Sequence, residues 1–485
     1  MTRSEEGTLN LASEDFRRLG HRAVDFVADY LAALPDRPCR TPVPADRQHA
    51  LMHEPVPEHG TRLDQLLDDV ESLFQYPMGN GSPRFFGWVN SPPAPIGIIA
   101  ELLAAGLNPS VAGGDHAATY IEHAALGWMR AIVGYPTDSG GLLTSGGSVA
   151  NLIGLAVMRH VKSGRTVRVR GLRNVGSTLV VYASTEGHSC IQKAIELLGI
   201  GSAQLRRVPV TSEWQMDIGA LRDMIARDRA VGLTPACVVA TAGTVNTGTI
   251  DPLDVIADLC ASEDIWLHVD AAYGGPGAML SALAPLYRGL DRADSLAIDP
   301  HKWMYVPVEC GCALVRDRAA MRDAFSLVPA YLRDDAALPW FSEFGIQQSR
   351  GFRALKLWMC LKYAGLDGYR NSIARDLALT RTLRQRLHES PDFQIVSAGP
   401  LSITCFRYVP GDGRDEAAVD RMNRMLLDAV QHEGEVFLTG TDLAGRFVLR
   451  SCIVNFRTTE EDVARLVNVV REVGQRVAEQ SSQAS

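Results

Sequence analysis

The chain has 485 residues, of which 46% are hydrophobic and 21% charged, a composition typical of a globular protein long enough for two or three domains. Its 56 acidic and 48 basic side chains give a formal net charge of −8. This acidic balance argues against a dedicated nucleic-acid-binding protein and against a polybasic membrane anchor.

The cysteines and the N-terminus indicate a compartment. Nine cysteines are scattered along the chain without a Cys-x-x-Cys pair, which favours a reducing environment over a disulfide framework. Residues 1–10 carry two glutamates and no apolar run, unlike a signal peptide. No apolar stretch approaches the roughly 20 residues that span a bilayer. We therefore predict a cytoplasmic protein with neither membrane nor nucleic acid as a partner.

Two helices are expected near the N-terminus. Apolar residues recur with helical periodicity over 11–34 and over 61–75, and prolines break the stretch 35–60 between them. Neither helix can bury its apolar face alone. We therefore predict that residues 1–92 form a helical arm rather than an independent domain.

From residue 96 onward, helical stretches alternate with short β-branched runs. The expected strands are 178–182, 236–241, 265–270, 295–299 and 311–315. The expected helices are 96–106, 117–134, 147–163, 189–199, 217–229 and 252–262. This alternation predicts an α/β domain with a mainly parallel sheet, which we place at 93–370.

The pattern changes after a long expected helix at 351–389. Strands are predicted at 402–408 and 447–453, and helices at 415–432 and 459–479. We interpret residues 371–485 as a smaller α+β domain at the C-terminus.

The sharpest chemical feature is the run Asp299-Pro300-His301-Lys302-Trp303, which follows a buried-looking strand. Ligands bind at the carboxyl ends of strands in open α/β sheets. We expect a lysine there to be desolvated, and desolvation lowers a lysine pKa and makes its amine a nucleophile for Schiff-base chemistry. An exposed loop lysine is the alternative, and this run alone does not separate the two.

A second strand ends in an acid followed by small residues, at 265–275. Asp270 at this position is suited to pair with the cationic ring nitrogen of pyridoxal phosphate, beside a Schiff-base lysine. The alternative is an aspartate that caps a following helix. Asp270 and Lys302 follow successive predicted strands, which strengthens the cofactor interpretation.

Two further stretches fall at the same predicted sheet edge. The run 143–151 places glycines and hydroxyls at a helix N-terminus, where free N–H groups and the helix dipole bind anions. His188 follows another strand and is suited to stacking on a planar ring or to proton transfer. A plain helix cap and a structural histidine are the respective alternatives.

Other site types are disfavoured. The sequence has no Gly-x-Gly-x-x-Gly, no P-loop Gly-Lys-Ser/Thr after the glycines, and no Gly-x-Ser-x-Gly nucleophile elbow. Three histidines near 49–59 lie in the proline-broken segment without a His-Glu-x-x-His helix, so we predict no metal site.

Taken together, these motifs resemble the group II pyridoxal-phosphate decarboxylases, the family of aromatic L-amino-acid decarboxylase. His-Val-Asp-Ala-Ala-Tyr-Gly at 268–274 and Asp-Pro-His-Lys-Trp at 299–303 carry the resemblance. Further family motifs occur in order at 83–88, 187–189, 240–244, 352–356 and 447–450. The resemblance covers roughly residues 10–475. It implies the aspartate aminotransferase-like fold type I and a homodimer with the active site at the interface, the arm packing on the partner.

The resemblance also implies roles for single residues. Lys302 would form the Schiff base with pyridoxal 5'-phosphate, Asp270 would keep the ring nitrogen protonated, and His188 would stack on the ring. The other implied cofactor contacts are Ala272 on the opposite face, Thr244 and Ser349, and, around the phosphate, Gly146, Gly147, Ser148 and His301.

Tyr331 matches the catalytic-loop tyrosine that returns a proton to the substrate carbon after CO2 leaves. Relatives with phenylalanine there tend toward oxidative deamination, because a carbanion without a proton donor can react with oxygen. Tyr331 therefore favours simple decarboxylation, on a loop expected to act as a lid.

The implied substrate contacts are Trp88, Val89, Asn90, Ser91, Asn108, Ser110 and Arg450. Arg450 matches the arginine near the substrate carboxylate. Asn80, Asn108 and Ser110 stand where aromatic-substrate enzymes carry apolar walls, and Trp88 replaces a tyrosine. Ser349 stands where those enzymes often have glycine, whereas histidine- and tyrosine-preferring relatives often have serine. We expect a more polar pocket, since a buried polar group needs a partner.

The resulting hypothesis is an L-amino-acid decarboxylase that produces a primary amine. The alternatives are an aldehyde synthase on the same site, an aminotransferase, which the fold also permits, and a scaffold with a vestigial site. The joint presence of Lys302, Asp270, His188 and Tyr331 argues against the scaffold.

Overall fold

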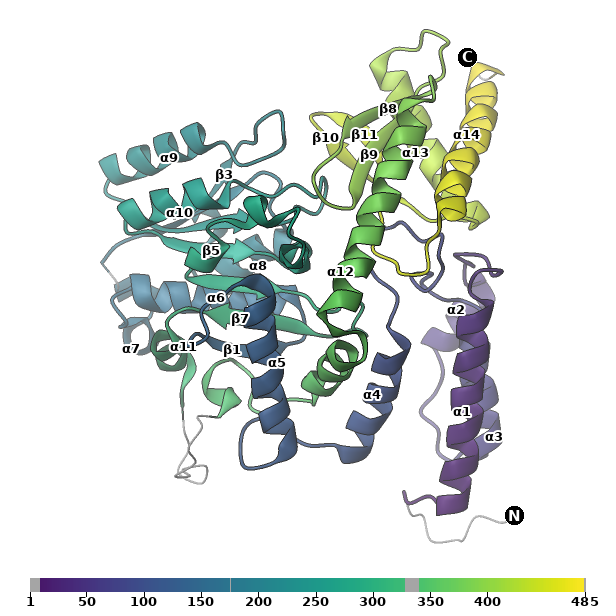
Figure 1. Cartoon of the computed structure of the whole chain (residues 1–485), viewed down its shortest axis with the longest axis horizontal. Helices are drawn as coiled ribbons and strands as arrows, with labels where there is room; N and C mark the ends of the chain where they lie inside the picture. The colour runs from purple at the N-terminus through teal and green to yellow at the C-terminus, as the bar shows by residue number, and fades with distance from the viewer. Residues whose placement is uncertain (1–8, 175, 328–339, 484–485) are drawn as a thin grey trace.

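The computed structural model of the chain describes residues 9–174, 176–327 and 340–483. Within that part, a large α/β unit and a small α+β unit lie side by side, and a helical arm extends from them (Figure 1). The mainly parallel large sheet and the small C-terminal unit confirm the predicted fold class.

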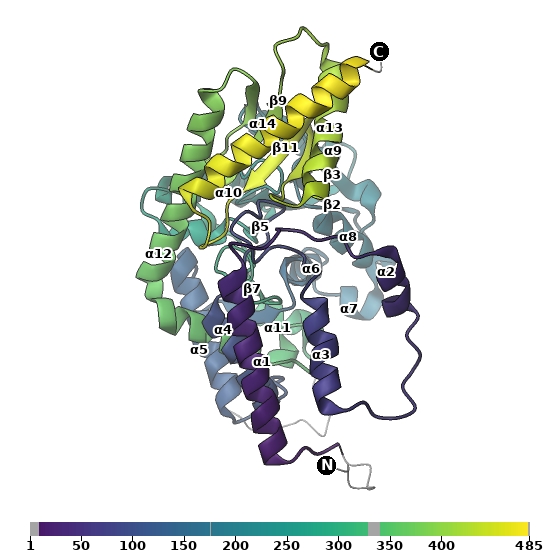
Figure 2. The same cartoon turned by 90° about the vertical axis from the view of Figure 1, so that its right-hand side faces the viewer.

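The arm consists of α1 (Ser13–Ala33), α2 (Ala45–Met52) and α3 (Leu63–Leu73). Helices α1 and α3 run alongside each other, and none of their residues is buried (Figure 2). Helix α2 lies in the stretch that the prolines were expected to break. Its N-cap is Pro44, a place where the fixed φ of proline suits a helix start.

Two helices lead from the arm into the large unit. They are α4 (Pro95–Leu107) and α5 (Ala117–Val133). Both pack against the long helix α12 (Arg353–His388). The outer side of α4 leaves four large apolar residues exposed by 39–62%: Ile99, Leu102, Leu103 and Leu107.

The large sheet has seven strands in the order β1-β7-β6-β5-β4-β2-β3. These are β1 (Gly140–Thr144), β2 (Leu179–Ser184), β3 (Leu205–Val208), β4 (Thr234–Thr241), β5 (Trp266–Asp270), β6 (Ser295–Ile298) and β7 (Gly311–Val315). Only β7 runs antiparallel to its neighbours. The carboxyl ends of the other six strands therefore meet at one edge, which is where ligands bind in such sheets.

Helices cover both faces of this sheet. They are α6 (Gly147–Lys162), α7 (Val167–Arg170), α8 (Ser189–Leu197), α9 (Ile218–Ala230), α10 (Leu253–Ser262) and α11 (Arg318–Phe325). Helices α6 and α8 lie in the connections from β1 to β2 and from β2 to β3, which run toward the β3 edge of the sheet. Helices α9 and α10 lie in the connections from β3 to β4 and from β4 to β5, which run back toward the β1 edge. Right-handed crossovers therefore place these two pairs on opposite faces, and α6 contacts α8.

The predicted strands and helices of the large unit are all present, with ends shifted by a few residues. Strands β1 and β3 were not predicted. Strand β1 begins with two glycines, which have low strand propensity. Its glycines are needed for packing, because a Cβ on Gly141 would lie 2.7 Å from Leu314 Cδ2.

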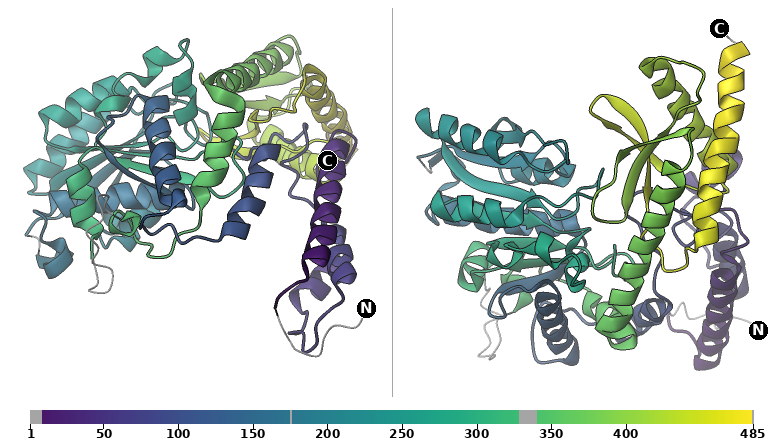
Figure 3. Two further views of the ribbon diagram at one scale, coloured as in Figure 1. Left: turned by 60° about the horizontal axis from the view of Figure 1, so that its bottom comes forward. Right: turned by 45° about the horizontal axis from the view of Figure 1, so that its top comes forward.

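Helix α12 (Arg353–His388) joins the two units, as Figure 3 shows in green. It bends at Gly365, whose φ of 62° is a left-handed conformation that favours glycine. Beyond the bend it contacts β8 and α14 of the small unit. The division we proposed at 370/371 falls inside this helix.

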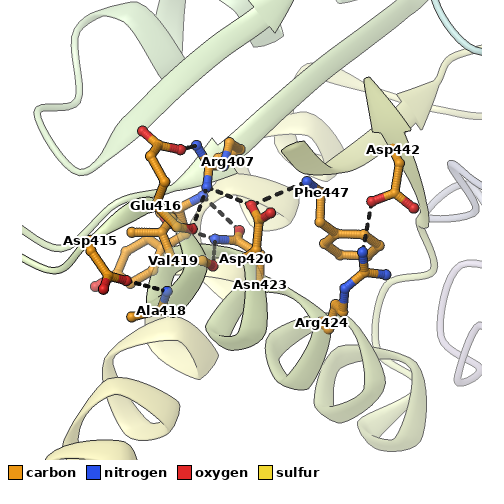
Figure 4. Close-up of polar contacts among 11 residues, drawn as sticks. Arg407, Asp415, Glu416, Ala418, Val419, Asp420, Asn423, Arg424, Asp442 and Phe447 are labelled. Atoms are coloured by element: carbon orange, nitrogen blue, oxygen red, sulfur yellow. Dashed lines mark hydrogen bonds and ion pairs between the residues drawn. The ribbon is translucent and has the colours of Figure 1, made fainter. Parts of the chain in front are cut away.

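The small unit has a four-stranded antiparallel sheet in the order β10-β11-β9-β8. Its elements are β8 (Phe393–Ser397), β9 (Ile403–Tyr408), α13 (Glu416–Glu433), β10 (Thr439–Leu443), β11 (Arg446–Cys452) and α14 (Glu460–Gln483). Arg407 on β9 is 1% exposed and binds Glu416 and Asp420 of α13 at 2.6 and 2.7 Å (Figure 4). These ion pairs fix α13 on the sheet.

The nine cysteines are all buried thiols, and none is in a disulfide. Over residues 9–174, 176–327 and 340–483, no helix has the length and apolar content to cross a membrane.

Candidate active site

A cavity of about 290 Å³ opens at the carboxyl edge of the large sheet. It lies where β2, β4, β5 and β6 end and where the β1–α6 turn begins. Its walls include the predicted residues Gly146, Gly147, Ser148, His188, Asp270, Ala272, His301 and Lys302. Eight positions chosen from four separate stretches of sequence therefore meet in one pocket.

Strand register explains this meeting. Asp270 at the end of β5 lies beside Thr241 of β4 on one side and Ala297 of β6 on the other. Two residues further along the β6 path, the chain turns at Asp299, and Lys302 follows within the same turn, with its N–H bonded to the Asp299 carbonyl. The acid and the lysine thus face one another across neighbouring strand ends.

Lys302 is paired with Asp299 and lies near the charge of Asp270. Its Nζ lies 2.9 Å from Asp299 Oδ2. Burial alone would lower the pKa of Lys302, but the negative charges of Asp299 and Asp270 outweigh it and raise this pKa above its ordinary value. The prediction of a lowered lysine pKa is therefore wrong, because it considered desolvation without the two neighbouring carboxylates.

Asp270 is 5% exposed, and burial raises its pKa while the Lys302 charge lowers it. Its Oδ1 accepts a hydrogen bond of 3.1 Å from the Ala272 N–H. This bond resembles the helix-cap alternative, yet no α-helix follows directly; the chain continues into a short 3-10 turn at Gly275–Met279. The carboxylate lines the cavity while it orders the turn.

The β1–α6 turn approaches Asp299 and Ala272 closely. A Cβ on Gly147 would lie 2.6 Å from Asp299 Oδ2 and 3.1 Å from Ala272 Cβ. Gly146 is the N-cap of α6, and no side chain caps this helix. The first N–H groups of a helix have no intrahelical acceptor, so this turn offers anion-binding donors at the cavity wall.

His188 is the N-cap of α8, and its Nδ1 accepts a hydrogen bond of 3.1 Å from the Cys190 N–H. Partial desolvation lowers the pKa of the ring. A neutral His188 therefore carries its proton on Nε2, because Nδ1 is an acceptor. His188 therefore caps α8, as the structural alternative expected, and it also lines the cavity.

Thr244 lies behind the wall rather than in it. It is fully buried, its Oγ1 is 2.7 Å from Thr247 Oγ1, and it accepts the Thr249 N–H. These bonds hold the turn whose neighbours Gly243 and Val245 line the cavity.

The predicted substrate residues divide into two groups. The first group lies beside the cavity rather than in its wall: Arg450 Nε donates to the wall residue Val245 at 2.8 Å, and Arg450 Nη1 donates to Trp88 O at 2.9 Å. Arg450 is 3% exposed, and its Nη2 has no partner among the described residues. Val89 and Asn90 follow Trp88, and Ser91 donates to His301 O at 3.1 Å.

The second group does not reach the pocket within one chain. Its members Asn108 and Ser110 are exposed, and so is Ser349, which was predicted as a cofactor contact. Asn108 lines a separate cavity of about 330 Å³ between α4 and the start of α12. Tyr331 lies outside the described residues.

Several wall residues were not singled out from the sequence. They are Ser145, Val149, Asn151, Cys190, Thr241, Gly243, Val245, Tyr273 and Asp299. Asp299 had a signal, because it lies in the same short run as Lys302. Asn151 had a weaker one, its place one helical turn after Gly147.

Comparison with known proteins decides the family. Residues 44–409 match the model of the pyridoxal-dependent decarboxylase conserved domain. The chain belongs to the pyridoxal-dependent decarboxylase family. It is a decarboxylase of fold type I that uses pyridoxal phosphate.

The relatives of this decarboxylase cover its whole length. An aromatic-L-amino-acid decarboxylase of Bacillus atrophaeus is 32% identical, over 97% of this chain and 98% of the relative. A phenylacetaldehyde synthase of Arabidopsis thaliana is 31% identical, over 95% and 96%. The crystal structure of Oryza sativa TDC with PLP and tryptamine has a TM-score of 0.90 and 27% identity, over 97% and 99%.

The residues in the pocket fit this cofactor. Lys302 is an amine that two acids hold in the cavity, Asp270 is a buried acid suited to a cationic ring nitrogen, and the α6 turn offers N–H donors to a phosphate. The glycine at 147 leaves the room that a Cβ would fill.

Proposed function

We propose that this enzyme converts an aromatic or related L-amino acid into the corresponding primary amine and CO2, in a pocket more polar than is usual in the family. The carrying observation is the pair formed by Lys302 against Asp299 and Asp270, with the buried Arg450 guanidinium at the neighbouring segment 88–91. The names of the relatives, aromatic-L-amino-acid decarboxylase and tyrosine decarboxylase, support an aromatic substrate.

Each group has a part in this proposal. Lys302 would hold the cofactor through its amine, and Asp270 would keep a proton on the ring nitrogen. The bound cofactor supplies an electron sink for the pair left on the α-carbon when CO2 departs. Arg450, whose Nη2 has no partner among the described residues, would bind the substrate carboxylate, and His188 would pack against the cofactor ring with its Nε2–H as a donor.

Tyr331 then returns a proton to the α-carbon. The competing activity is that of an aldehyde synthase, and a specific observation favours considering it: relatives of this chain include phenylacetaldehyde synthases at 30–31% identity. Both activities share the first steps and differ in whether the carbanion meets a proton or oxygen.

The test is product analysis by mass spectrometry. The purified enzyme with added pyridoxal phosphate is incubated in air with a panel of L-amino acids. We expect an amine and one equivalent of CO2 from one or two aromatic members. Aldehyde, ammonia and hydrogen peroxide in place of amine would overturn the proposal in favour of the synthase; a keto acid would indicate an aminotransferase.

Tyr331→Phe sharpens this test. Without the phenol as proton donor, we expect amine to fall and aldehyde to rise, with uptake of oxygen. An oxygen electrode and mass spectrometry measure both. An unchanged amine yield would show that another residue supplies the proton.

We further propose a homodimer in the cytoplasm, with the second substrate group supplied across the interface. The support is the uncovered apolar side of α4 and the exposed Phe16, Val24 and Leu66 of the arm. Exposed apolar residues gathered on projecting helices are typical of protein–protein interfaces.

A further inference from the structure

A chain of buried hydrogen bonds reaches the cofactor cavity from behind. Trp266 and His268 lie on β5, Ser295 begins β6, and Asn151 and Gly147 belong to α6. The side chains of Asn151, His268 and Ser295 are fully buried. Asn151 alone among these side chains lines the cavity.

The distances join these groups in one line. Trp266 Nε1 is 2.8 Å from Ser295 Oγ, which is 2.7 Å from His268 Nδ1. His268 Nε2 is 2.6 Å from Asn151 Oδ1. Asn151 Nδ2 donates to the Gly147 carbonyl at 2.8 Å, the carbonyl that begins α6. Every contact is within hydrogen-bond distance.

Chemistry gives the line a single direction. The indole N–H of Trp266 can only donate, so Ser295 Oγ accepts from it. At the other end, the Gly147 carbonyl can only accept, so Asn151 presents Nδ2 to it and Oδ1 to His268. His268 Nε2 must then donate. Its Nδ1 accepts from the Ser295 hydroxyl.

This arrangement needs a neutral imidazole with its proton on Nε2. Burial lowers the pKa of His268 to about 3, so the ring is neutral at physiological pH. Each hydrogen bond in this chain therefore has one donor and one acceptor, and none of the groups is charged.

The same face of α6 is pressed against the sheet at two glycines. Gly147, Asn151 and Gly154 are spaced by four and three residues and share one helix face. A Cβ on Gly154 would lie 2.8 Å from His268 Cε1 and Nδ1 and 3.0 Å from Ser295 Oγ. The close approach brings Asn151 within reach of His268.

Asn151 also touches the opposite wall. Its Nδ2 lies 3.6 Å from Cys190 Sγ, and the Cys190 N–H donates to His188 Nδ1. One amide thus contacts both the phosphate-facing turn and the segment that orients His188.

We propose that Asn151 and His268 are positioning residues that hold the first turn of α6 in the orientation that binds the cofactor phosphate. Neither touches the reacting atoms; His268 fixes the Asn151 amide, and the amide fixes the turn. The inference rests on the cofactor contacts proposed above and adds to them.

The chain offers a matched control in Asn423 of the small unit (Figure 4). Asn423 is fully buried on α13, and its Nδ2 donates to the Val419 carbonyl four residues earlier at 2.9 Å, as Asn151 does to Gly147. In addition, Asn423 Oδ1 accepts a hydrogen bond from the Tyr408 N–H, and Asn423 Nδ2 donates to the Tyr408 carbonyl. Its replacement removes a comparable set of bonds at a place remote from the cavity.

The experiment measures the dissociation constants of pyridoxal 5'-phosphate and of pyridoxal for the full-length apoenzyme, by absorbance and fluorescence titration. The variants are Asn151→Leu, His268→Phe, their combination, and Asn423→Leu. Thermal unfolding of each apoenzyme gives the structural cost separately.

We expect Asn151→Leu and His268→Phe each to weaken binding of the phosphorylated cofactor about tenfold, as for loss of one or two buried hydrogen bonds. Binding of pyridoxal should change less than threefold. The double variant should lose no more affinity for pyridoxal 5'-phosphate than the weaker-binding single variant, because both substitutions interrupt the same chain of hydrogen bonds. Asn423→Leu should lower the melting temperature and leave both constants unchanged.

Three results would overturn the inference: equal weakening for the two ligands, the same weakening in Asn423→Leu, or additive effects in the combination. Where a leucine variant does not fold, Asn151→Asp keeps the shape but sets a carboxylate oxygen against the Gly147 carbonyl. The Asn151→Asp variant should still weaken the binding of pyridoxal 5'-phosphate more than the binding of pyridoxal. A wild-type protein that binds neither ligand would instead refute the cofactor contacts themselves.

Discussion

The two sides of the pocket are built differently. On the cofactor side, Asp270, Asp299 and Asn151 are at most 5% exposed and belong to strand ends and helix starts of one sheet. On the predicted substrate side, Asn108 and Ser110 lie on the surface of the chain. In one chain the residues of the cofactor side are therefore in place, whereas the dimer that we propose would have to complete the predicted substrate wall.

The largest expected effect comes from Lys302→Ala. Loss of the amine that holds the cofactor should reduce decarboxylation by about 10⁴-fold or more, since residues that act as a unit fail together. The melting temperature of the apoenzyme should fall at neutral pH, because the variant leaves Asp299 and Asp270 buried without their cationic partner. Steady-state CO2 release and calorimetry measure these. Appreciable turnover would place the reactive amine elsewhere.

The next largest effect is expected from disrupting the proposed dimer, which would separate the cofactor side from the predicted substrate wall. Leu102 and Leu103 of α4 are each 52% exposed. Replacing both by glutamate should give a monomer in analytical ultracentrifugation that still binds pyridoxal phosphate but loses activity by about 100-fold or more, as expected when one wall is missing.

One control accompanies this variant. Replacing the exposed Met425 of α13 by glutamate should leave the dimer intact. A fully active monomer would contradict the comparison, because it would show that one chain completes the substrate wall.

Arg450→Met tests the part of the substrate side that one chain does supply. The substrate carboxylate would lose a charge-assisted hydrogen bond, so KM should rise about 10- to 100-fold. The dissociation constant of the cofactor should change little. Arg407→Met, another buried arginine of the small unit, should lower stability without raising KM. If the dissociation constant of the cofactor rose in parallel with KM, the result would show that Arg450 supports cofactor binding instead of substrate binding.

The smallest expected effect concerns support behind Lys302. Trp303 Nε1 and Tyr305 Oη both donate to Asp376 Oδ2 of α12, at 2.8 and 2.6 Å. Burial raises the pKa of Asp376 from 3.8 to about 7. Because the folded state holds this proton more tightly, the stabilising contribution of the protonated acid is complete below pH 4 and disappears as the pH rises to 7.

Asp376→Asn removes this dependence. From pH 5 to pH 8 the wild type should lose about 2–3 kcal/mol of unfolding free energy that the asparagine variant keeps. Urea unfolding at the two pH values measures the difference. Parallel stability changes in both proteins would assign the pH dependence to other groups.

The sequence was informative where a local pattern carries the structure. Buried strands that end in Asp270 or before Lys302 are visible as apolar runs followed by polar residues. The pattern failed where packing overrides propensity: β1 starts with two glycines that only the neighbouring Leu314 and Met321 explain. The raised pKa of Lys302 required knowing that Asp299 turns back toward it. The Asn151–His268 contact joins residues 117 positions apart, which no local pattern contains.

The antiparallel strand β7 separates β1 from β6 in the sheet. The ends of β1 and β6 therefore lie two strand spacings apart, about 10 Å, and the turn after β1 must cross this gap to approach Asp299. Gly311 at the start of β7 permits the first turn to fold over it, since a Cβ there would lie 2.6 Å from the Gly146 backbone. The order of three strands thus sets how far the first turn must reach across β7 to approach the turn that bears Lys302. A bulkier residue at position 311 would push the first turn away from the second without changing any group in the cavity wall.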